Sequence, residues 1–374
     1  YRKTSKLFNV CKISAESEKG KGSRFSFRLP HGIIRMISAI IMLSAFNGYI
    51  EANNINNPDE HEIRNLSLAN SYVDSIYVSN INGQFDKALQ YADGENVSFA
   101  FQGGEPLMAG LPYFEHFAEK VKVSNKLNSQ IFFSTQTNGT LVTDEWCEFF
   151  HKNNFLVGLS LDGDFDNNSF RIDDKAQNTF YKIIKAADIF TKHNVQFNIL
   201  TVLTGRCAEN IDAILRYFKK RGFKYLQFIP CLRPFGDDTE SELYMTVEQY
   251  KHFLIHGFNA YVKDYVQGNY TSIRYFDNLV HLYLGNPTEQ CGMCGHCMHQ
   301  FVVEGNGNIY PCDFYCTDEW LLGNINTPTE NFDTLAHCEK ATEFLRESLY
   351  IPEECKKCRF YPICRAGGCK RSKE

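Results

Sequence analysis

Cysteine placement is the feature that most restricts what this chain can fold into. Ten of its 14 cysteines lie between Cys291 and Cys369, and the other four are spread over the first 290 residues. Small disulfide-bonded proteins are rich in cysteine over their whole length. A cysteine-poor body followed by a cysteine-rich module instead indicates that the module binds a metal ion or a cluster.

Size and charge narrow the possible classes of function. The 374 residues are long enough for two domains, and the net charge of −5 argues against binding to nucleic acid. The apolar segment 33–46 is shorter than the roughly 20 residues of a membrane span. It resembles the apolar core of a signal peptide, with a short buried helix as the alternative. We expect no nucleic-acid partner, no membrane attachment and a cytoplasmic location.

From residue 94 onward, apolar strand-like runs alternate with helical patterns. The predicted strands are 97–101, 131–135, 155–161, 197–203 and 225–230. The predicted helices between and after them are 111–126, 143–152, 178–193, 208–221, 246–266 and 273–284. This alternation predicts an α/β fold with a parallel sheet, which we interpret as an incomplete barrel. Ligands of such sheets bind at the carboxyl ends of the strands.

Residues 1–93 form an atypical N-terminal segment. A strand is predicted over 23–30, and helices are predicted around 64–75 and 84–92. Residues 20–30 resemble the closing strand of the ATP-binding domain of sensor histidine kinases. Residues 64–92 resemble the first helical hairpin of a helical-repeat sensor region. Both similarities cover fragments that are too short to fold as those domains.

Three predicted strands end in polar turns. The first is followed by Gln102-Gly103-Gly104-Glu105-Pro106, in which two glycines allow the backbone to approach a ligand closely. The second ends in residues 135–139 (TQTNG), and the third ends in residues 160–163 (SLDG), with Arg171 after a loop. Each motif alone also fits a tight turn. Three of them on one rim favour a ligand site.

The cysteine-rich module contains two groups of closely spaced thiols. In the first, Cys291-x2-Cys294-x2-Cys297 precedes a predicted hairpin over 301–310, which leads to Cys312 and Cys316. The second is Cys355-x2-Cys358-x5-Cys364-x4-Cys369. Thiolates gathered on turns are suited to zinc or to iron–sulfur clusters. A ferredoxin-type run would place a cysteine at position 301, where this chain has phenylalanine. Disulfides and a structural zinc ion are the alternatives.

These motifs together resemble the radical S-adenosylmethionine (radical SAM) enzymes that carry a C-terminal SPASM domain. The closest resemblance is to the anaerobic sulfatase-maturating enzymes. The matching segments are residues 99–106 (FAFQGGEP), 136–140 (QTNGT), 157–163 (VGLSLDG), 195–202 (VQFNILTV), 227–232 (QFIPCL) and the cysteine module. The resemblance implies a partial (β/α)6 radical SAM barrel over residues 94–285 and a SPASM domain over residues 286–374.

The resemblance also implies the site residues. Gly103, Gly104 and Glu105 would bind the amino group of S-adenosylmethionine. Ser160, Arg171 and Leu232 would contact the rest of the cofactor, and Gln102 would lie near both cofactor and substrate. One auxiliary [4Fe–4S] cluster would be bound by Cys291, Cys297, Cys312 and Cys369. A second would be bound by Cys355, Cys358 and Cys364, and Asp313 would act as the catalytic base.

The implied reaction is the oxidation of a Cys or Ser in a sulfatase to formylglycine. A 5′-deoxyadenosyl radical removes hydrogen from Cβ, Asp313 takes a proton, and an electron passes to an auxiliary cluster. The expected partners are a sulfatase-like protein or peptide substrate and an external electron donor or acceptor.

The chain departs from the family pattern at two cluster sites. The family's CxxxCxxC loop should lie before Gln102, but Cys11 is the only cysteine before Cys147. The second auxiliary cluster lacks a fourth ligand between Cys369 and Glu374. We therefore expect the chain not to cleave S-adenosylmethionine. The alternatives are a non-catalytic iron–sulfur or peptide-binding module and a maturase for another peptide. Cys294, Cys316 and Cys338 receive no role.

Overall fold

A seven-stranded parallel sheet forms the centre of the molecule. The computed structural model describes residues 12–18, 21–28, 72–74, 84–236 and 239–373. The strands follow one another in the sheet in sequence order, from β3 to β9, and every neighbouring pair is parallel. Their bounds are Tyr72–Asp74 (β3), Val97–Phe101 (β4), Ile131–Thr137 (β5), Leu156–Ser160 (β6), Gln196–Leu203 (β7), Tyr225–Pro230 (β8) and Ser272–Ile273 (β9).

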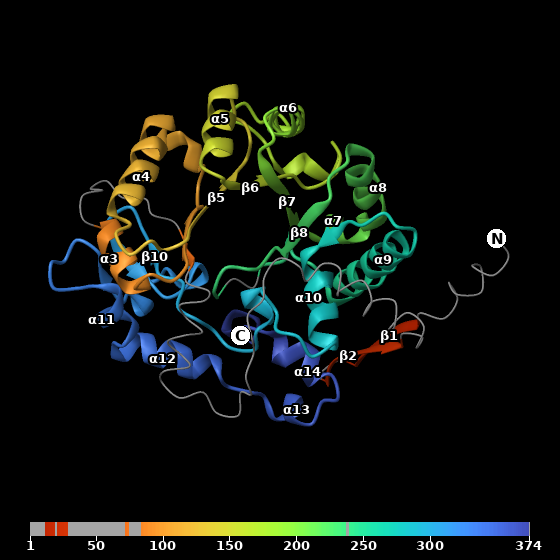
Figure 1. The fold of residues 1–374 in the computed structure, drawn as a ribbon. Helices are drawn as coiled ribbons and strands as arrows, with labels where there is room; N and C mark the ends of the chain where they lie inside the picture. Colours follow the sequence, from red (N-terminus) through yellow and green to blue (C-terminus); the bar gives the residue numbers. More distant parts are fainter. Residues whose placement is uncertain (1–11, 19–20, 29–71, 75–83, 237–238, 374) are drawn as a thin grey trace.

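Helices cover the outer face of this sheet, which curves into an open barrel (Figure 1). They are α3 (Gln84–Ala92), α4 (Leu111–Ser124), α5 (Asp144–Lys152), α6 (Phe180–Lys192), α7 (Gly205–Glu209), α8 (Ile211–Arg221), α9 (Val247–Val266) and α10 (Arg274–Tyr283). Short 3-10 turns follow β4 and β6, at Pro106–Ala109 (η1) and Asn167–Phe170 (η2). Parallel strands joined by helices on one side give the incomplete barrel that the sequence predicts.

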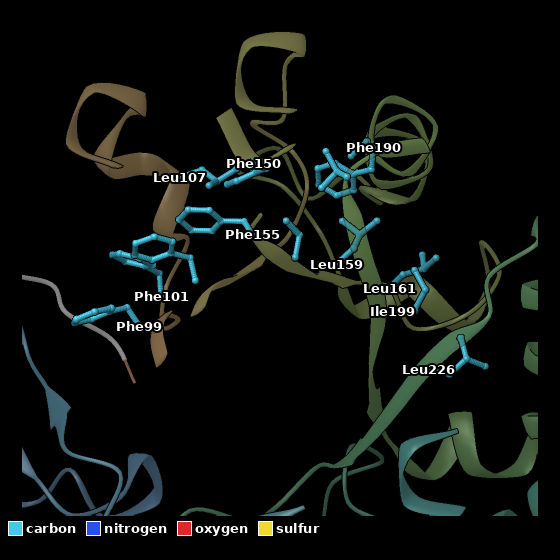
Figure 2. Packing of buried hydrophobic residues seen from close by; sticks show 14 of the residues in the cluster. Phe99, Phe101, Leu107, Phe150, Phe155, Leu159, Leu161, Phe190, Ile199 and Leu226 are labelled. Carbon is cyan, nitrogen blue, oxygen red and sulfur yellow. The ribbon is translucent and has the colours of Figure 1, made fainter. Parts of the chain in front are cut away.

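The core lies between the sheet and these helices, and aromatic rings fill much of it. The rings of Phe133 and Phe155 stack with centroids 5.0 Å apart, and Phe101 packs against Phe114 at 4.6 Å. Figure 2 shows Phe99, Phe101 and Phe155 in one continuous layer with the aliphatic side chains of β6 and β7. Each fully buried aromatic side chain removes a large apolar area from water on folding. This packing holds the strand ends in place.

The residues after α10 form a second unit, which closes the open side of the barrel (Figure 1). Its strands form a three-stranded antiparallel sheet: Val302–Val303 (β10), Asn308–Tyr310 (β11) and Gly323–Asn324 (β12). Its helices are Phe332–Ala336 (α11), Glu339–Ser348 (α12), Glu353–Lys356 (α13) and Tyr361–Cys364 (α14). Its 3-10 turns are Cys291–Met293 (η3), Asp313–Tyr315 (η4), Asp318–Trp320 (η5), Arg365–Gly367 (η6) and Lys370–Ser372 (η7).

Helix α3 joins this second unit to the barrel. The Lys87 ammonium donates hydrogen bonds to the carbonyl oxygens of Ile325 (2.7 Å) and Thr327 (2.9 Å). On the barrel side, the ring of Phe85 meets that of Phe117 at 4.8 Å in a T-shaped contact. The two units therefore share buried side chains through α3, in addition to the chain connection after α10.

The N-terminal segment differs in part from its prediction. The strand expected over 23–30 is present as β2 (Lys21–Arg28), which pairs with β1 (Lys12–Glu18) in an antiparallel ribbon. The helix expected over 84–92 is present as α3. The helix expected around 64–75 is wrong at its end, because residues 72–74 form strand β3 beside β4. Its remaining part and the apolar segment 33–46 lie outside the described residues.

Candidate functional site

The turn after β4 is linked to the end of β5 through the buried carboxylate of Glu105. This carboxylate accepts hydrogen bonds from the Thr137 hydroxyl (2.9 Å), the Asn138 N–H (2.7 Å) and the N–H of Leu107 (3.1 Å). The two preceding glycines, Gly103 and Gly104, have φ of +88° and +55°. L side chains rarely adopt these values, so the turn requires glycine. Its backbone lies open at the rim of the sheet.

The end of β6 is fixed by Asp162, a residue whose role the spacing did not reveal. Its carboxylate lies 2.7 Å from Arg171 Nε and accepts a hydrogen bond from Arg171 Nη2 at 2.8 Å. It also accepts the N–H of Val202, in β7, at 2.8 Å. Only 5% of Asp162 is exposed. The predicted site residue Arg171 is thus held at the rim by a buried carboxylate next to Ser160, the last residue of β6.

A cavity of about 1470 Å³ lies inside the open barrel and extends to the cysteine module. Gln102 and Leu232 line its barrel side, and Gln136 donates a hydrogen bond to Gln102 there (2.9 Å). Asp313 lines the opposite side. The predicted residues Gly103, Gly104, Glu105, Ser160 and Arg171 belong to the strand ends beside the cavity but do not line it. Gln102 and Leu232, which are predicted to contact the cofactor, and Asp313, the predicted base, therefore face the same cavity.

The first group of cysteines surrounds the module side of this cavity. Four thiols line the cavity there: Cys291, Cys297 and Cys312 of the first group and Cys369 of the second. Burial raises the pKa of the Cys291 thiol, and the neighbouring thiols of Cys297, Cys294 and Cys369 raise it further. Burial also raises the pKa of Cys312, as does Asp313, whose Oδ1 accepts from Cys312 Sγ at 3.3 Å.

These four thiols fit the chemistry of a cluster. Buried thiols that raise one another's pKa are stabilised as thiolates by a bound cationic centre, and an all-sulfur donor set suits iron–sulfur clusters. None of the described cysteines forms a disulfide. In the described part of the chain, no three His, Cys, Asp or Glu side chains are grouped closely enough to hold a single metal ion.

The second group lies at the surface of the module. Cys358 and Cys364 are exposed and border the same cavity, whereas Cys355, in α13, does not line it. The Cys358 N–H donates to the Cys355 carbonyl at 3.1 Å. Burial and the nearby thiols of Cys364 and Cys358 raise the pKa of Cys355. The three thiols therefore lie in one region at the surface of the module.

Comparison with known proteins assigns the family. The model of the radical SAM superfamily matches residues 71–218, and the SPASM model, an iron–sulfur cluster-binding domain, matches residues 286–359. The cysteine-type anaerobic sulfatase-maturating enzyme of Clostridium perfringens (strain 13 / Type A) is 44% identical over 292 residues, which are 77% of this chain and 77% of that enzyme. This chain belongs to the anaerobic sulfatase-maturating enzyme family.

Further relatives agree with this assignment. The serine-type anaerobic sulfatase-maturating enzyme of Bacteroides thetaiotaomicron is 29% identical over 359 residues, covering 91% of this chain and 82% of that enzyme. The solved structure of native anSMEcpe with bound AdoMet and Kp18Cys peptide matches with a TM-score of 0.74 at 39% identity. The match covers 81% of this chain and 87% of that one. The family, the radical SAM barrel with its SPASM domain, and the enzyme class are confirmed as predicted.

The structure also gives local roles to the cysteines that the sequence left unassigned. Cys338 Sγ caps α12 by accepting the Ala341 N–H at 3.4 Å. Cys294 Sγ and Cys316 Sγ lie 3.6 Å and 3.7 Å from the carbonyl oxygens of Gln290 and Cys312.

In the part of the chain that is described, no helix of this family member is long and apolar enough to cross a membrane.

Proposed function

We propose that this chain is a maturase that oxidises a cysteine of a sulfatase peptide to a thioaldehyde, which water converts to formylglycine with release of the sulfur as hydrogen sulfide. The observation that carries the proposal is that Gln102 and Leu232 share one cavity with Asp313 and with the thiols of Cys291, Cys297, Cys312 and Cys369. The preference for cysteine over serine rests on the greater identity to a cysteine-type relative, 44% against 29% for a serine-type one.

The predicted residues would divide between binding the cofactor and acting on the substrate. Gly103, Gly104 and Glu105 would hold the amino group of S-adenosylmethionine, and Ser160, Arg171 and Leu232 would contact its remainder. Bound S-adenosylmethionine would supply the radical that removes hydrogen from the substrate Cβ. Asp313 is exposed to the cavity, so its carboxylate can accept the proton that the substrate releases. Gln102, which lines the cavity, would orient the peptide between the cofactor and Asp313.

The cysteines divide into two proposed cluster sites. Cys291, Cys297, Cys312 and Cys369 would hold one auxiliary [4Fe–4S] cluster, and Cys355, Cys358 and Cys364 would contribute three ligands to a second. We place the barrel at residues 94–285 and the SPASM domain at 286–374; from the segment 1–93, β3 adds an edge strand to the barrel sheet and α3 packs on the barrel. An external electron carrier would exchange electrons with these clusters.

We also propose that residues 1–374 cannot cleave S-adenosylmethionine by themselves. Cleavage in this family needs three thiolates from a CxxxCxxC loop before Gln102, and Cys11 is the only cysteine before Cys147. Reconstituted and reduced protein should yield no 5′-deoxyadenosine. Its detection would refute this part of the proposal without affecting the assignment of the peptide site.

A chimaera tests the proposed activity directly. The N-terminal part of the Clostridium perfringens relative, with its cysteine loop, would replace the residues before Gln84 of this chain. The chimaera should form 5′-deoxyadenosine and convert a sulfatase peptide with cysteine to the aldehyde, as followed by mass spectrometry. Asp313→Asn in the same chimaera should lose the aldehyde and retain cofactor cleavage. Cleavage without aldehyde in the parent chimaera would favour a maturase for another peptide.

A further inference from the structure

The last described residue, Lys373, holds two separate segments of the SPASM domain together. Its ammonium donates hydrogen bonds to the carbonyl oxygen of Gly295 (3.1 Å) and to that of Ser348 (2.6 Å). Gly295 lies in the loop between Cys291 and Cys297, and Ser348 is the last residue of α12. The cation is therefore anchored in the loop that carries two of the proposed ligands.

The same contacts place this cation beside Cys297. The Ser348 hydroxyl accepts a hydrogen bond from the Cys297 N–H at 2.9 Å, so the residue that anchors the ammonium also anchors the ligand. Burial lowers the pKa of Lys373, whereas the thiols of Cys297, Cys369 and Cys355 raise it. These thiols belong to both proposed cluster sites. Thiolates around a bound cluster would favour the charged ammonium further.

The ammonium groups of Lys373 and of the neighbouring Lys370 have different kinds of partner. The Lys370 ammonium lies 3.2 Å from a carboxylate oxygen of Glu347 and 4.7 Å from the ring centroid of Tyr315. A carboxylate offsets the field of a cation. Among the described residues, the hydrogen-bond partners of the Lys373 ammonium are two carbonyl oxygens, which carry no net charge and therefore do not neutralise it. Lys373 thus contributes a fixed positive charge beside the first cysteine group.

We propose that Lys373 is a positioning residue whose charge raises the reduction potential of the cluster bound by Cys291, Cys297, Cys312 and Cys369. The proposal rests on that ligand set, which is part of the proposed function. Reduction makes a cluster one charge more negative, and a fixed cation nearby stabilises the reduced state more than the oxidised state. The cluster then accepts an electron more readily from the substrate side of the cavity.

Potentiometric titration of the anaerobically reconstituted chain, followed by electron paramagnetic resonance, measures this effect. Lys373→Met should lower the ratio of reduced to oxidised cluster at a fixed potential about tenfold, which corresponds to about 59 mV for a one-electron couple. Lys373→Arg keeps the charge and should restore the parent ratio. Lys340→Met is the matched control, because the Lys340 ammonium lies 3.3 Å from Glu343, and it should leave the potential unchanged.

Iron and sulfide counts separate the two ways in which the account could fail. An unchanged potential in Lys373→Met with full iron content would overturn the role of Lys373. So would a potential that falls equally in Lys373→Arg, since loss of packing rather than of charge would then be the cause. If Cys291→Ser kept all of its iron, the proposed ligand set itself would be wrong, whatever the behaviour of Lys373.

Discussion

At the scale of single residues, Asp162 is the buried carboxylate that links the end of β6 to Arg171 and to β7. Its carboxylate binds Arg171 through two nitrogens and accepts the N–H of Val202, while only 5% of the residue is exposed. The motif SLDG indicated a turn here, but the partner Arg171 lies nine residues further along an irregular loop. The sequence associated Arg171 with this strand end, but spacing could not show that Asp162 is the side chain that holds it there.

Asp162→Asn should destabilise the barrel and displace Arg171. Removing one charge of a largely buried pair leaves the other uncompensated, so we expect a loss of about 2–4 kcal/mol in the free energy of unfolding. Urea denaturation measures the loss. Asp173→Asn is the control, because Asp173 pairs with the exposed Lys182 at 2.8 Å and should matter little. Equal effects of the two substitutions would contradict the structural role of Asp162.

Asp277 should give the stability a recognisable pH dependence. Burial raises its pKa, although hydrogen bonds from Ser272 and Tyr261 oppose the shift. An acid whose pKa is higher in the folded than in the unfolded protein stabilises the fold when the pH is below the pKa of the unfolded state. This contribution is lost as the pH rises through the pKa of the folded state. Asp277→Asn should remove this component. From pH 4 upward, the urea midpoint of the parent protein should therefore fall relative to that of Asp277→Asn. If the midpoints of the two proteins changed in parallel with pH, the effect would be excluded.

At the scale of helices and strands, the long periodic elements were predictable and the short ones were not. All five predicted strands and the helices between them are present within a few residues of their expected bounds. Strands β3 and β9 were missed because three and two residues show no periodicity, and they form only by pairing with β4 and β8. The helix predicted over 208–221 is two helices, α7 and α8, which meet at Asn210.

The turn after β5 should be intolerant of any side chain at Gly139. Its φ is +75°, and an added Cβ would lie 2.7 Å from Leu159 Cδ1 and 3.2 Å from the Cβ of Ala186. Gly139→Ala should cost about 2–4 kcal/mol, from backbone strain and overpacking together. Gly222→Ala is the matched control, because φ is +76° there and no atom lies within 4 Å.

Only the strain, about 1–2 kcal/mol, applies at Gly222. Thermal or urea denaturation of the two alanine variants compares these costs. If both variants lost the same stability, the close packing of this turn against β6 and α6 would not matter.

At the scale of the whole molecule, one cavity is lined both by residues of the barrel strands and by residues of the cysteine module. The cysteine spacing indicated a cluster module, and the strand ends indicated a ligand rim. Their common cavity depends on how the module closes the open side of the barrel (Figure 1). Contacts such as that of Lys87 with Ile325 and Thr327 fix this arrangement, and they span more than two hundred residues. No local pattern in the sequence encodes them.

Anaerobic reconstitution with an iron and sulfide count tests the central account most directly. We expect one cluster on Cys291, Cys297, Cys312 and Cys369 and up to one more on Cys355, Cys358 and Cys364, hence about four to eight iron atoms per chain. The double substitution Cys291→Ser and Cys297→Ser should remove about four of them. A parent count near twelve would require a third cluster and contradict the account. So would a double variant that retained its iron, or a colourless parent that held zinc.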